Sequence, residues 1–254
     1  MRGTGEAGWP HGVLLLRPAR SAITARDVHA AETALGWAFP PGYEAYVTSL
    51  GEGSYCDLVR ITAPGTIADS TAWGGASTSR AEWSRHWAWD GAVLTPADVP
   101  HLVPLGDTYD GDQIVAHRDG GVFVLPRHDD VVLRCGATLR GALDALTGGA
   151  TPSFCPWGEA SSYENFLPEA DGVGWSYERA RDAVAALGLH AAVDLDDHGA
   201  RFLVPAIGGH VTLVPSGYAH VACLASREAE AGAFKEALVA AGLTRRSAWG
   251  DGAG

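Results

Sequence analysis

A series of short apolar segments between residues 102 and 133 constrains the fold of this chain more than any other feature. Each segment has three to five residues, and turns rich in glycine and charged residues separate residues 103–105, 113–117, 122–125 and 131–133. Parallel strands need crossover connections of about a dozen residues or more, and these turns are too short to supply them. The pair Asp119-Gly120 between two apolar segments is typical of a hairpin. The sequence therefore predicts an antiparallel β-meander.

Helix signals lie on both sides of the predicted meander. Thr24 precedes apolar residues with helical spacing, and Asp27 follows three residues later, which is the pattern of a capping box. This pattern predicts a helix over residues 24–35. A second short helix is expected to start near Pro41, because a helix tolerates proline in its first turn. Residues 138–146 predict a third helix, with its leucines on one stripe.

The 254-residue chain is long enough for one or two domains. Residues 147–156 contain two glycines, two prolines and no charged residue, which indicates a linker. We therefore expect a first domain over residues 1–150 and a second, smaller domain over residues 156–247. The predicted fold class is α+β: an antiparallel β-meander sheet flanked by N-terminal and C-terminal helices, followed by a smaller α+β domain.

The charge of the chain limits the partners that it can have. Asp+Glu total 30 against 18 for Lys+Arg, which gives a formal net charge of -12. We expect no nucleic-acid partner, because binding to phosphates needs clustered cations. Between Arg85 and Arg118 there is no Lys or Arg, and the carboxylates are Asp90, Asp98, Asp107, Asp110 and Asp112. Such a field would accelerate encounter with a basic protein, or would only keep the chain soluble.

Other features restrict the location and the chemistry of the protein. The sequence has no apolar stretch of about 18 residues, so we expect no membrane partner. Its N-terminus lacks the pattern of a secretory signal, and we expect a cytoplasmic protein. The four cysteines are widely spaced and include no C-x-x-C pair. We therefore expect neither a metal nor a cofactor.

Four of the nine tryptophans lie between residues 65 and 100. Two of them, Trp83 and Trp87, are four residues apart, a spacing that places both rings on one side of a short helix. One interpretation is that these rings close the side of the core. The other is an exposed binding patch, because tryptophan is enriched in the hot spots of protein interfaces.

Catalytic motifs are scarce in this sequence. It contains no H-E-x-x-H, G-x-S-x-G, Walker or dinucleotide-binding motif. The aspartates of residues 107–112 resemble part of a calcium loop, but Arg118 occupies the position of the essential glutamate. A turn that its own carboxylates hold together is therefore favoured. His198, beside Asp196 and Asp197, leaves open a general base in a hydrolase.

The order of motifs in the first domain resembles that of a known superfamily. Residues 28–46 combine a helix that bears a glutamate, a Leu-Gly pair, a Phe-Pro pair and a second helix with tyrosines. This segment is similar to the opening signature of the SUKH superfamily, which includes bacterial immunity proteins and fungal regulators of cell-wall synthesis. Residues 102–106 and 109–112 resemble its second signature, and residues 138–146 its closing helix. The likeness covers roughly residues 20–147.

The resemblance implies a non-enzymatic immunity protein of a polymorphic toxin system. Such a protein neutralises a bacterial toxin by direct stoichiometric binding, and the acidity of this chain favours a basic toxin. We expect no catalytic residue, and the candidate partner-binding residues are Asp57, Trp83, Trp87, Trp89, Asp107, Asp110 and Asp112. One alternative is a regulatory scaffold that binds an endogenous protein in cell-envelope or signalling processes. A third hypothesis is a small hydrolase in the second domain.

Overall fold

The computed structural model divides the chain into two compact units. The described residues are 9–19, 21–72, 87, 93–118, 120–148, 150–157, 161–168, 174–187, 191–194 and 199–246. One unit comprises Met1–Leu14 and Ala19–Pro156, and the other comprises Leu15–Pro18 and Trp157–Gly254. Each unit combines helices with a β-sheet, so the α+β fold class is confirmed.

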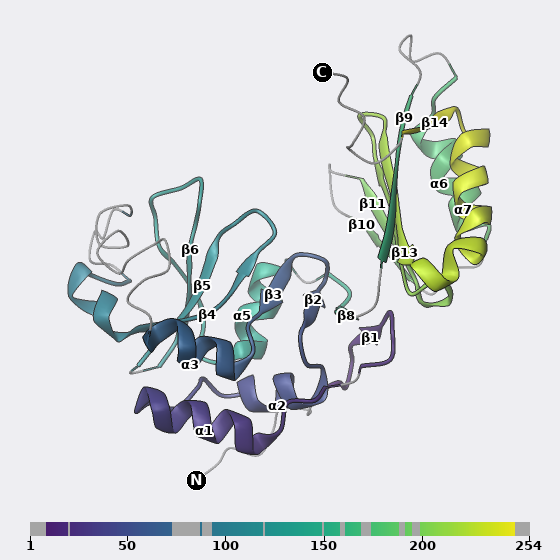
Figure 1. Ribbon diagram of the computed structural model, residues 1–254. Coiled ribbons are helices and arrows are strands. Elements are labelled where there is room, and N and C mark those ends of the chain that lie inside the picture. The colour runs from purple at the N-terminus through teal and green to yellow at the C-terminus, as the bar shows by residue number, and fades with distance from the viewer. Residues whose placement is uncertain are drawn as a thin grey trace, which may run out of the picture. The chain divides into compact units, whose positions relative to one another are not determined.

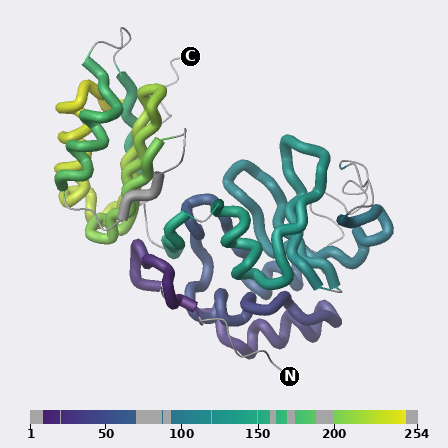
Figure 2. The backbone as a smooth tube through the Cα atoms, turned by 180° about the vertical axis from the view of Figure 1, so that it is seen from behind, coloured from purple at the N-terminus to yellow at the C-terminus, as the bar shows by residue number. Residues whose placement is uncertain are grey.

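A sheet with eight strands in the described residues forms the centre of the first unit (Figure 1). Its spatial order is β1-β8-β2-β3-β4-β5-β6-β7. The strands are β1 (Leu14–Leu15), β2 (Gly53–Tyr55), β3 (Val59–Ile61), β4 (Leu102–Thr108), β5 (Gln113–His117), β6 (Val122–Leu125), β7 (Leu133–Gly136) and β8 (Ser153–Pro156). Consecutive strands from β2 to β7 pair antiparallel, and Figure 2 shows the tube of β4 to β7 running back and forth. The predicted meander is confirmed from β4 to β7, and the β2–β3 hairpin adds to its first strand across the segment that contains α3 and η1.

Strand β8 lies in the segment that the sequence indicated as a linker. It pairs antiparallel with β2, and Tyr55 stands opposite Phe154. A side chain at Gly53 would collide with the Phe154 ring, so glycine permits this close approach. The linker prediction was wrong for β8, because its partner strand is far away in the sequence and no local pattern announces the pairing.

Helices α1 and α5 of the first unit begin at the predicted caps. Thr24 N donates to Asp27 Oδ2 at 2.8 Å and Asp27 N donates to Thr24 Oγ1 at 3.3 Å, which completes the capping box. Thr138 caps the last helix in a similar way. In the described residues the helices are α1 (Ala25–Leu35), α2 (Tyr43–Ser49), α3 (Pro64–Ala72), the 3-10 helix η1 (Pro96–His101) and α5 (Leu139–Leu146). Helix α3 was not predicted, because its apolar residues are too few to show a helical period.

The motif residues that carry the SUKH resemblance hold this unit together. Glu32 Oε1 accepts a hydrogen bond from Phe39 N at 2.9 Å, which ties the segment after α1 back to the helix. Gly36 has a φ of 64°, the left-handed conformation in which helices commonly end. Tyr43 is buried, and its hydroxyl donates to Thr62 O at 2.7 Å. The first signature therefore builds the fold around α1 and α2.

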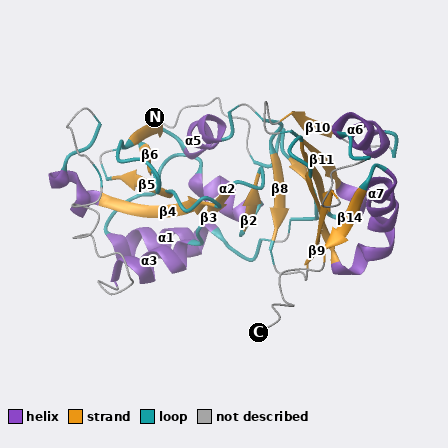
Figure 3. Cartoon of the chain, turned by 90° about the horizontal axis from the view of Figure 1, so that it is seen from above, coloured by secondary structure: helices purple, strands orange, loops and turns teal. Residues whose placement is uncertain are grey.

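The second unit has helices on one face of an antiparallel sheet (Figure 3). In the described residues the sheet has six strands in the order β10-β11-β12-β13-β9-β14. They are β9 (Ser161–Pro168), β10 (Ala191–Asp194), β11 (Ala200–Val204), β12 (Gly209–Val214), β13 (Tyr218–Leu224) and β14 (Leu243–Arg246). The helices are α6 (Tyr177–Ala185), α7 (Glu228–Ala240) and the 3-10 helices η3 (Pro205–Ile207) and η4 (Ala225–Arg227). Phe166 and Phe202 of the sheet pack with Val184 of α6 and Leu238 of α7.

The sequence predicts the helices of the second unit well and its sheet incompletely. Capping and breaker residues predict helices over residues 176–187 and 228–241, and the structure confirms both as α6 and α7. The pair Ser216-Gly217 predicts the hairpin turn that joins β12 and β13, which is also confirmed. The pair Gly208-Gly209 predicts a second two-residue turn, but the 3-10 helix η3 makes this connection, and Val204 stands opposite Gly209. Strands β9 and β14 were not predicted. Their pairing with each other joins distant segments, and β9 is mostly polar.

Helices in both units are short. The longest in the described residues is α7, with 13 residues. A bilayer crossing takes about 20 apolar residues. Within the same part of the chain, no helix has the length and apolar character of a membrane span.

Candidate functional site

Two hairpin turns lie at the same end of the first sheet. The β2–β3 turn contains Asp57, and the β4–β5 turn spans residues 109–112. They are neighbours because Val59 of β3 stands opposite Thr108 of β4, and Tyr109 N donates to Leu58 O at 2.9 Å. The pairing of β3 with β4 thus brings Asp57, from one segment of the sequence, to the same end of the sheet as Asp107, Asp110 and Asp112 from another.

A third turn adds further carboxylates at this end. Leu125, the last residue of β6, stands opposite Gln113, so the β6–β7 turn lies beside the β4–β5 turn. Arg127 N in this turn donates to Asp112 Oδ1 at 2.9 Å. The turn also carries two exposed aspartates that the sequence analysis missed. We call this end of the sheet the acidic turn surface, and its residues are Asp57, Asp107, Asp110, Asp112, Asp129 and Asp130.

Asp112 supports the backbone of the turns. Besides the bond from Arg127 N, its carboxylate accepts a hydrogen bond from Thr108 Oγ1 at 3.0 Å. Asp112 N in turn donates to Thr108 Oγ1 at 3.1 Å. This is the self-supporting turn that the sequence favoured over a calcium loop. Asp110, by contrast, has an exposed side chain at the tip of the turn.

Tyr109 is a surface aromatic residue in the β4–β5 turn. Its side chain is among the most exposed large apolar groups, at 50%. The guanidinium of Arg60 lies 5.0 Å from the centre of the Tyr109 ring, and Arg60 Nε contacts Asp107 Oδ1 at 2.5 Å. A ring that is held in place this way loses less conformational entropy when it binds a partner. The sequence analysis missed Tyr109, although its position among three aspartates was visible.

The turn that presents Asp57 has an unfavourable backbone conformation. Cys56 and Asp57 have φ values of 51° and 52°, so two consecutive residues other than glycine are left-handed. Leu58 N donates to Tyr55 O at 3.1 Å and closes the turn. Asn-Gly is the usual pair in such hairpin turns, and other residues cost roughly 1–2 kcal/mol each. Asp57 thus occupies a position where glycine would lie with less strain.

The structure corrects the assignment of Trp87 to a partner-facing patch. Its side chain is 8% exposed and belongs to a core cluster with Phe123 and Val132. Trp87 Nε1 donates to Pro126 O at 2.8 Å, so the polar end of the ring is also used inside the unit. The interpretation of a ring that closes the side of the core is the correct one for Trp87. Trp83 and Trp89 lie outside the described residues.

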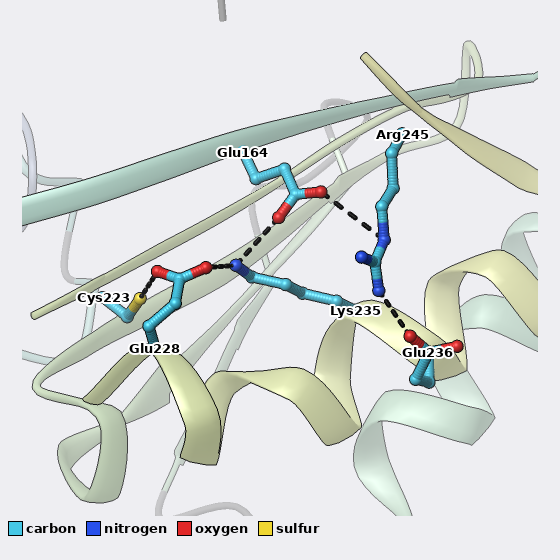
Figure 4. Close-up of polar contacts among 6 residues, drawn as sticks. All are labelled: Glu164, Cys223, Glu228, Lys235, Glu236 and Arg245. Carbon is cyan, nitrogen blue, oxygen red and sulfur yellow. Dashed lines mark hydrogen bonds and ion pairs between the residues drawn. The ribbon is translucent and has the colours of Figure 1, made fainter. Parts of the chain in front are cut away.

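A different group of charges lies between α7 and the sheet of the second unit (Figure 4). Lys235 is buried, and its Nζ contacts Glu164 Oε2 of β9 at 2.8 Å and also bonds Glu228 Oε1. Arg245 Nε of β14 lies 3.5 Å from Glu164 Oε1, and its Nη2 bonds Glu236. We call these five residues the Lys235 network. Lys235 is the only lysine in the sequence.

Cys223 lies beside the Lys235 network, and both its thiol and the amine of Lys235 are held in their protonated forms. Cys223 Sγ donates to Glu228 Oε2 at 3.5 Å. Burial, with the charge of Glu228, raises the pKa of the Cys223 thiol to about 11, so the nucleophilic thiolate is scarce at neutral pH. Burial opposes the charge of Lys235, but the bonds to Glu164 and Glu228 prevail and raise its pKa. A protonated thiol beside an ammonium group suits packing and anchoring rather than nucleophilic attack.

Two histidines of the second unit contact each other directly. His210 Nε2 of β12 and His220 Nε2 of β13 are 2.8 Å apart, with ring centres separated by 5.0 Å. These values place the nitrogens nearly on the line between the rings, as in a hydrogen bond. A tetrahedral zinc would hold such nitrogens about 3.3 Å apart, with both aimed at a common point. Burial lowers the pKa of His210 to about 3 and so favours its neutral form. His198, the candidate general base, lies outside the described residues.

The chain matches no protein-family model, no curated protein and no solved structure. The resemblance to the SUKH superfamily stays a prediction from the motif residues and the order of the elements.

Proposed function

We propose that this protein is an immunity protein that neutralises a bacterial toxin by binding it, with the acidic turn surface as the contact. The observation that carries the proposal is that carboxylates from three turns lie at one end of the first sheet, where Tyr109 is also exposed. The toxin that fits this surface is a basic protein. The SUKH resemblance suggests the biological class, and the surface supplies the means of recognition.

Recognition would proceed in two stages. Exposed aspartates at one end of the sheet attract a basic surface over a distance of about one Debye length, roughly 8 Å at physiological salt. Tyr109 then serves as an anchor, because aromatic side chains that become fully desolvated contribute most of the energy of many interfaces. Arg60 has already restricted the ring, so the cost of ordering it on binding is small. Inhibition follows when the bound protein covers the functional surface of the toxin.

The acidic turn surface inhibits by occlusion and needs no chemical step. Its best-ordered carboxylate, Asp112, is engaged in holding the turn. Its cation Arg60 bonds Asp107 and holds Tyr109. These side chains prepare a surface of fixed shape and charge, which is what a stoichiometric inhibitor requires.

The direct test is protection of cells that express the toxin encoded beside the gene of this protein. Co-expression of the wild-type chain should restore growth, and the purified proteins should form a one-to-one complex. A double variant, Asp110→Asn with Asp130→Asn, should bind about tenfold more slowly at low salt, because both charges are exposed and contribute to steering. The association rate of the wild type should also fall as salt increases.

A matched control removes the same amount of charge elsewhere. Asp182→Asn with Glu230→Gln changes two exposed carboxylates of the second unit and should leave the association rate within about twofold. Failure of the wild type to protect the cells would refute the proposed function. Equal loss of rate in both double variants would show that total charge acts and that the acidic turn surface has no special role.

A further inference from the structure

Strand β7 forms an open edge of the first sheet. The order of strands ends at β7, whose Leu133 and Arg134 stand opposite Val124 and Phe123 of β6. In the described part of the chain no strand pairs with its other side. Leu133 and Arg134 are both exposed, so the edge is accessible.

The register of the sheet shows which backbone groups of β7 point outward. His117 N donates to Gly121 O at the β5–β6 turn, so this pair is of the hydrogen-bonded type. Hydrogen-bonded and non-hydrogen-bonded pairs alternate along antiparallel strands. Along β6, Gly121 and Phe123 therefore bond to β5, and Val124 directs its backbone N–H and C=O to Leu133 of β7. Arg134, the next residue of β7, directs its own N–H and C=O away from the sheet. The N–H and C=O of Arg134 are therefore available to another extended chain.

The side chains beside this edge also favour a partner. Leu133 of β7 and Val131 just before the strand are 50% and 44% exposed, and apolar residues at an open edge attract other strands. The charged side chain of β7, Arg134, has its guanidinium 6.0 Å from the centre of the Phe123 ring. Asp129 and Asp130 precede Val131 directly, so a chain that pairs with this edge approaches negative charge at one end.

We infer that β7 is a docking edge for an extended, basic segment of a partner protein, which adds to the sheet as a further strand. The inference rests on the proposed function and specifies how the toxin would be held. Backbone hydrogen bonds to Arg134 supply the pairing, Leu133 supplies apolar contact, and the adjacent aspartates select a basic chain. A second copy of this protein is a poorer occupant, because each copy carries a net charge of -12.

The test uses the full-length protein and a short synthetic peptide in which lysine alternates with valine. Fluorescence anisotropy of the labelled peptide measures its affinity. Arg134→Pro removes the outward N–H, at a position of an edge strand where proline is tolerated, and should weaken binding at least tenfold. Arg134→Ala keeps the backbone N–H, and its affinity for the peptide should lie within about threefold of that of the wild type. Circular dichroism establishes that both variants are folded.

Two further measurements keep the inference falsifiable if Arg134→Pro does not fold. The same peptide methylated on alternate backbone nitrogens keeps its charge and side chains, and should bind the wild type at least tenfold more weakly. Leu133→Thr should bind the unmethylated peptide about threefold more weakly, because threonine keeps the preference for a strand and removes apolar contact.

Equal affinity for the methylated and unmethylated peptides would overturn the docking edge, since only side chains and charge would then matter. The cell-protection assay separates this outcome from failure of the proposed function. If the wild type protects cells but does not pair with the peptide, the proposed function stands and the docking edge is refuted. If it pairs with the peptide but does not protect cells, the docking edge stands and the proposed function is refuted.

Discussion

The acidic turn surface and the Lys235 network are both built from acidic side chains with a few cations, and they differ in burial. The side chain of Asp107 is 44% exposed, whereas that of Lys235 is 5% exposed. In the acidic turn surface, acidic side chains clearly outnumber cations. In the Lys235 network, Lys235 and Arg245 form ion pairs with three glutamates. Charges that leave water must be matched inside the fold, and charges that stay in water remain available to a partner.

The comparison predicts that loss of Lys235 has the largest effect on stability. Lys235→Met keeps the length of the side chain and leaves Glu164 and Glu228 without their ammonium partner. Breaking a buried pair by removing one partner costs about 3–5 kcal/mol, and the partial exposure of Glu228 places the expected loss near 3 kcal/mol. Urea denaturation at neutral pH measures the change in the free energy of unfolding.

The control for this prediction is an exposed ion pair at the start of the same helix. Arg227→Ala removes the exposed partner of Glu230 and should change the free energy of unfolding by about 0.5 kcal/mol or less. If Lys235→Met cost no more than Arg227→Ala, burial would not distinguish the Lys235 network from ordinary surface pairs.

Alanine variants of two aspartates in the acidic turn surface should differ in their free energy of unfolding, by less than the loss expected for Lys235→Met. Asp112→Ala removes the acceptor of the bonds from Thr108 and Arg127 and should cost about 1.5 kcal/mol. Asp110→Ala changes an exposed side chain and should lie within about 0.5 kcal/mol of wild type. Thermal or urea unfolding of the two variants compares them directly, and equal values would show that the turn does not depend on Asp112.

The smallest expected effect is the pH dependence of the Lys235 network. Hydrogen bonds from Lys235 and Ser162 lower the pKa of Glu228 in the folded state. A carboxylate of this kind stabilises the fold above its unfolded pKa, and that stability is lost as pH falls through its folded pKa. The stability gap between wild type and Lys235→Met should therefore narrow below about pH 4.5. Urea midpoints at pH 7, 5 and 4 test this, and a gap that widened on acidification would contradict it.

Local signals account for the parts of the fold that were predicted. The capping box at Thr24 and the cap at Thr138 act within one helical turn, so neighbouring residues suffice to recognise them. The hairpins of the meander also close over a few residues. Strands β8, β9 and β14 were missed because each pairs with a strand that is distant in the sequence.

The candidate site was partly visible in the sequence. Asp107, Asp110 and Asp112 are close in the chain, so their grouping needed no structure. That Asp57 and the β6–β7 turn join them depends on the register of β3 with β4 and of β5 with β6. Trp87 was misassigned because spacing shows which residues share a helix face and leaves open whether that face is covered.

The amino-acid sequence alone determined the α+β class, the capped helices, the meander and the excess of negative charge, because these depend on composition and on contacts between near neighbours. Tertiary structure decided which charges are buried. Glu164 and Lys235 meet between a helix and a sheet, while Asp110, Asp129 and Asp130 are exposed at one end of the first sheet. The reason is physical: hydration of a charge is set by everything that packs around it, and most of those neighbours come from distant parts of the chain.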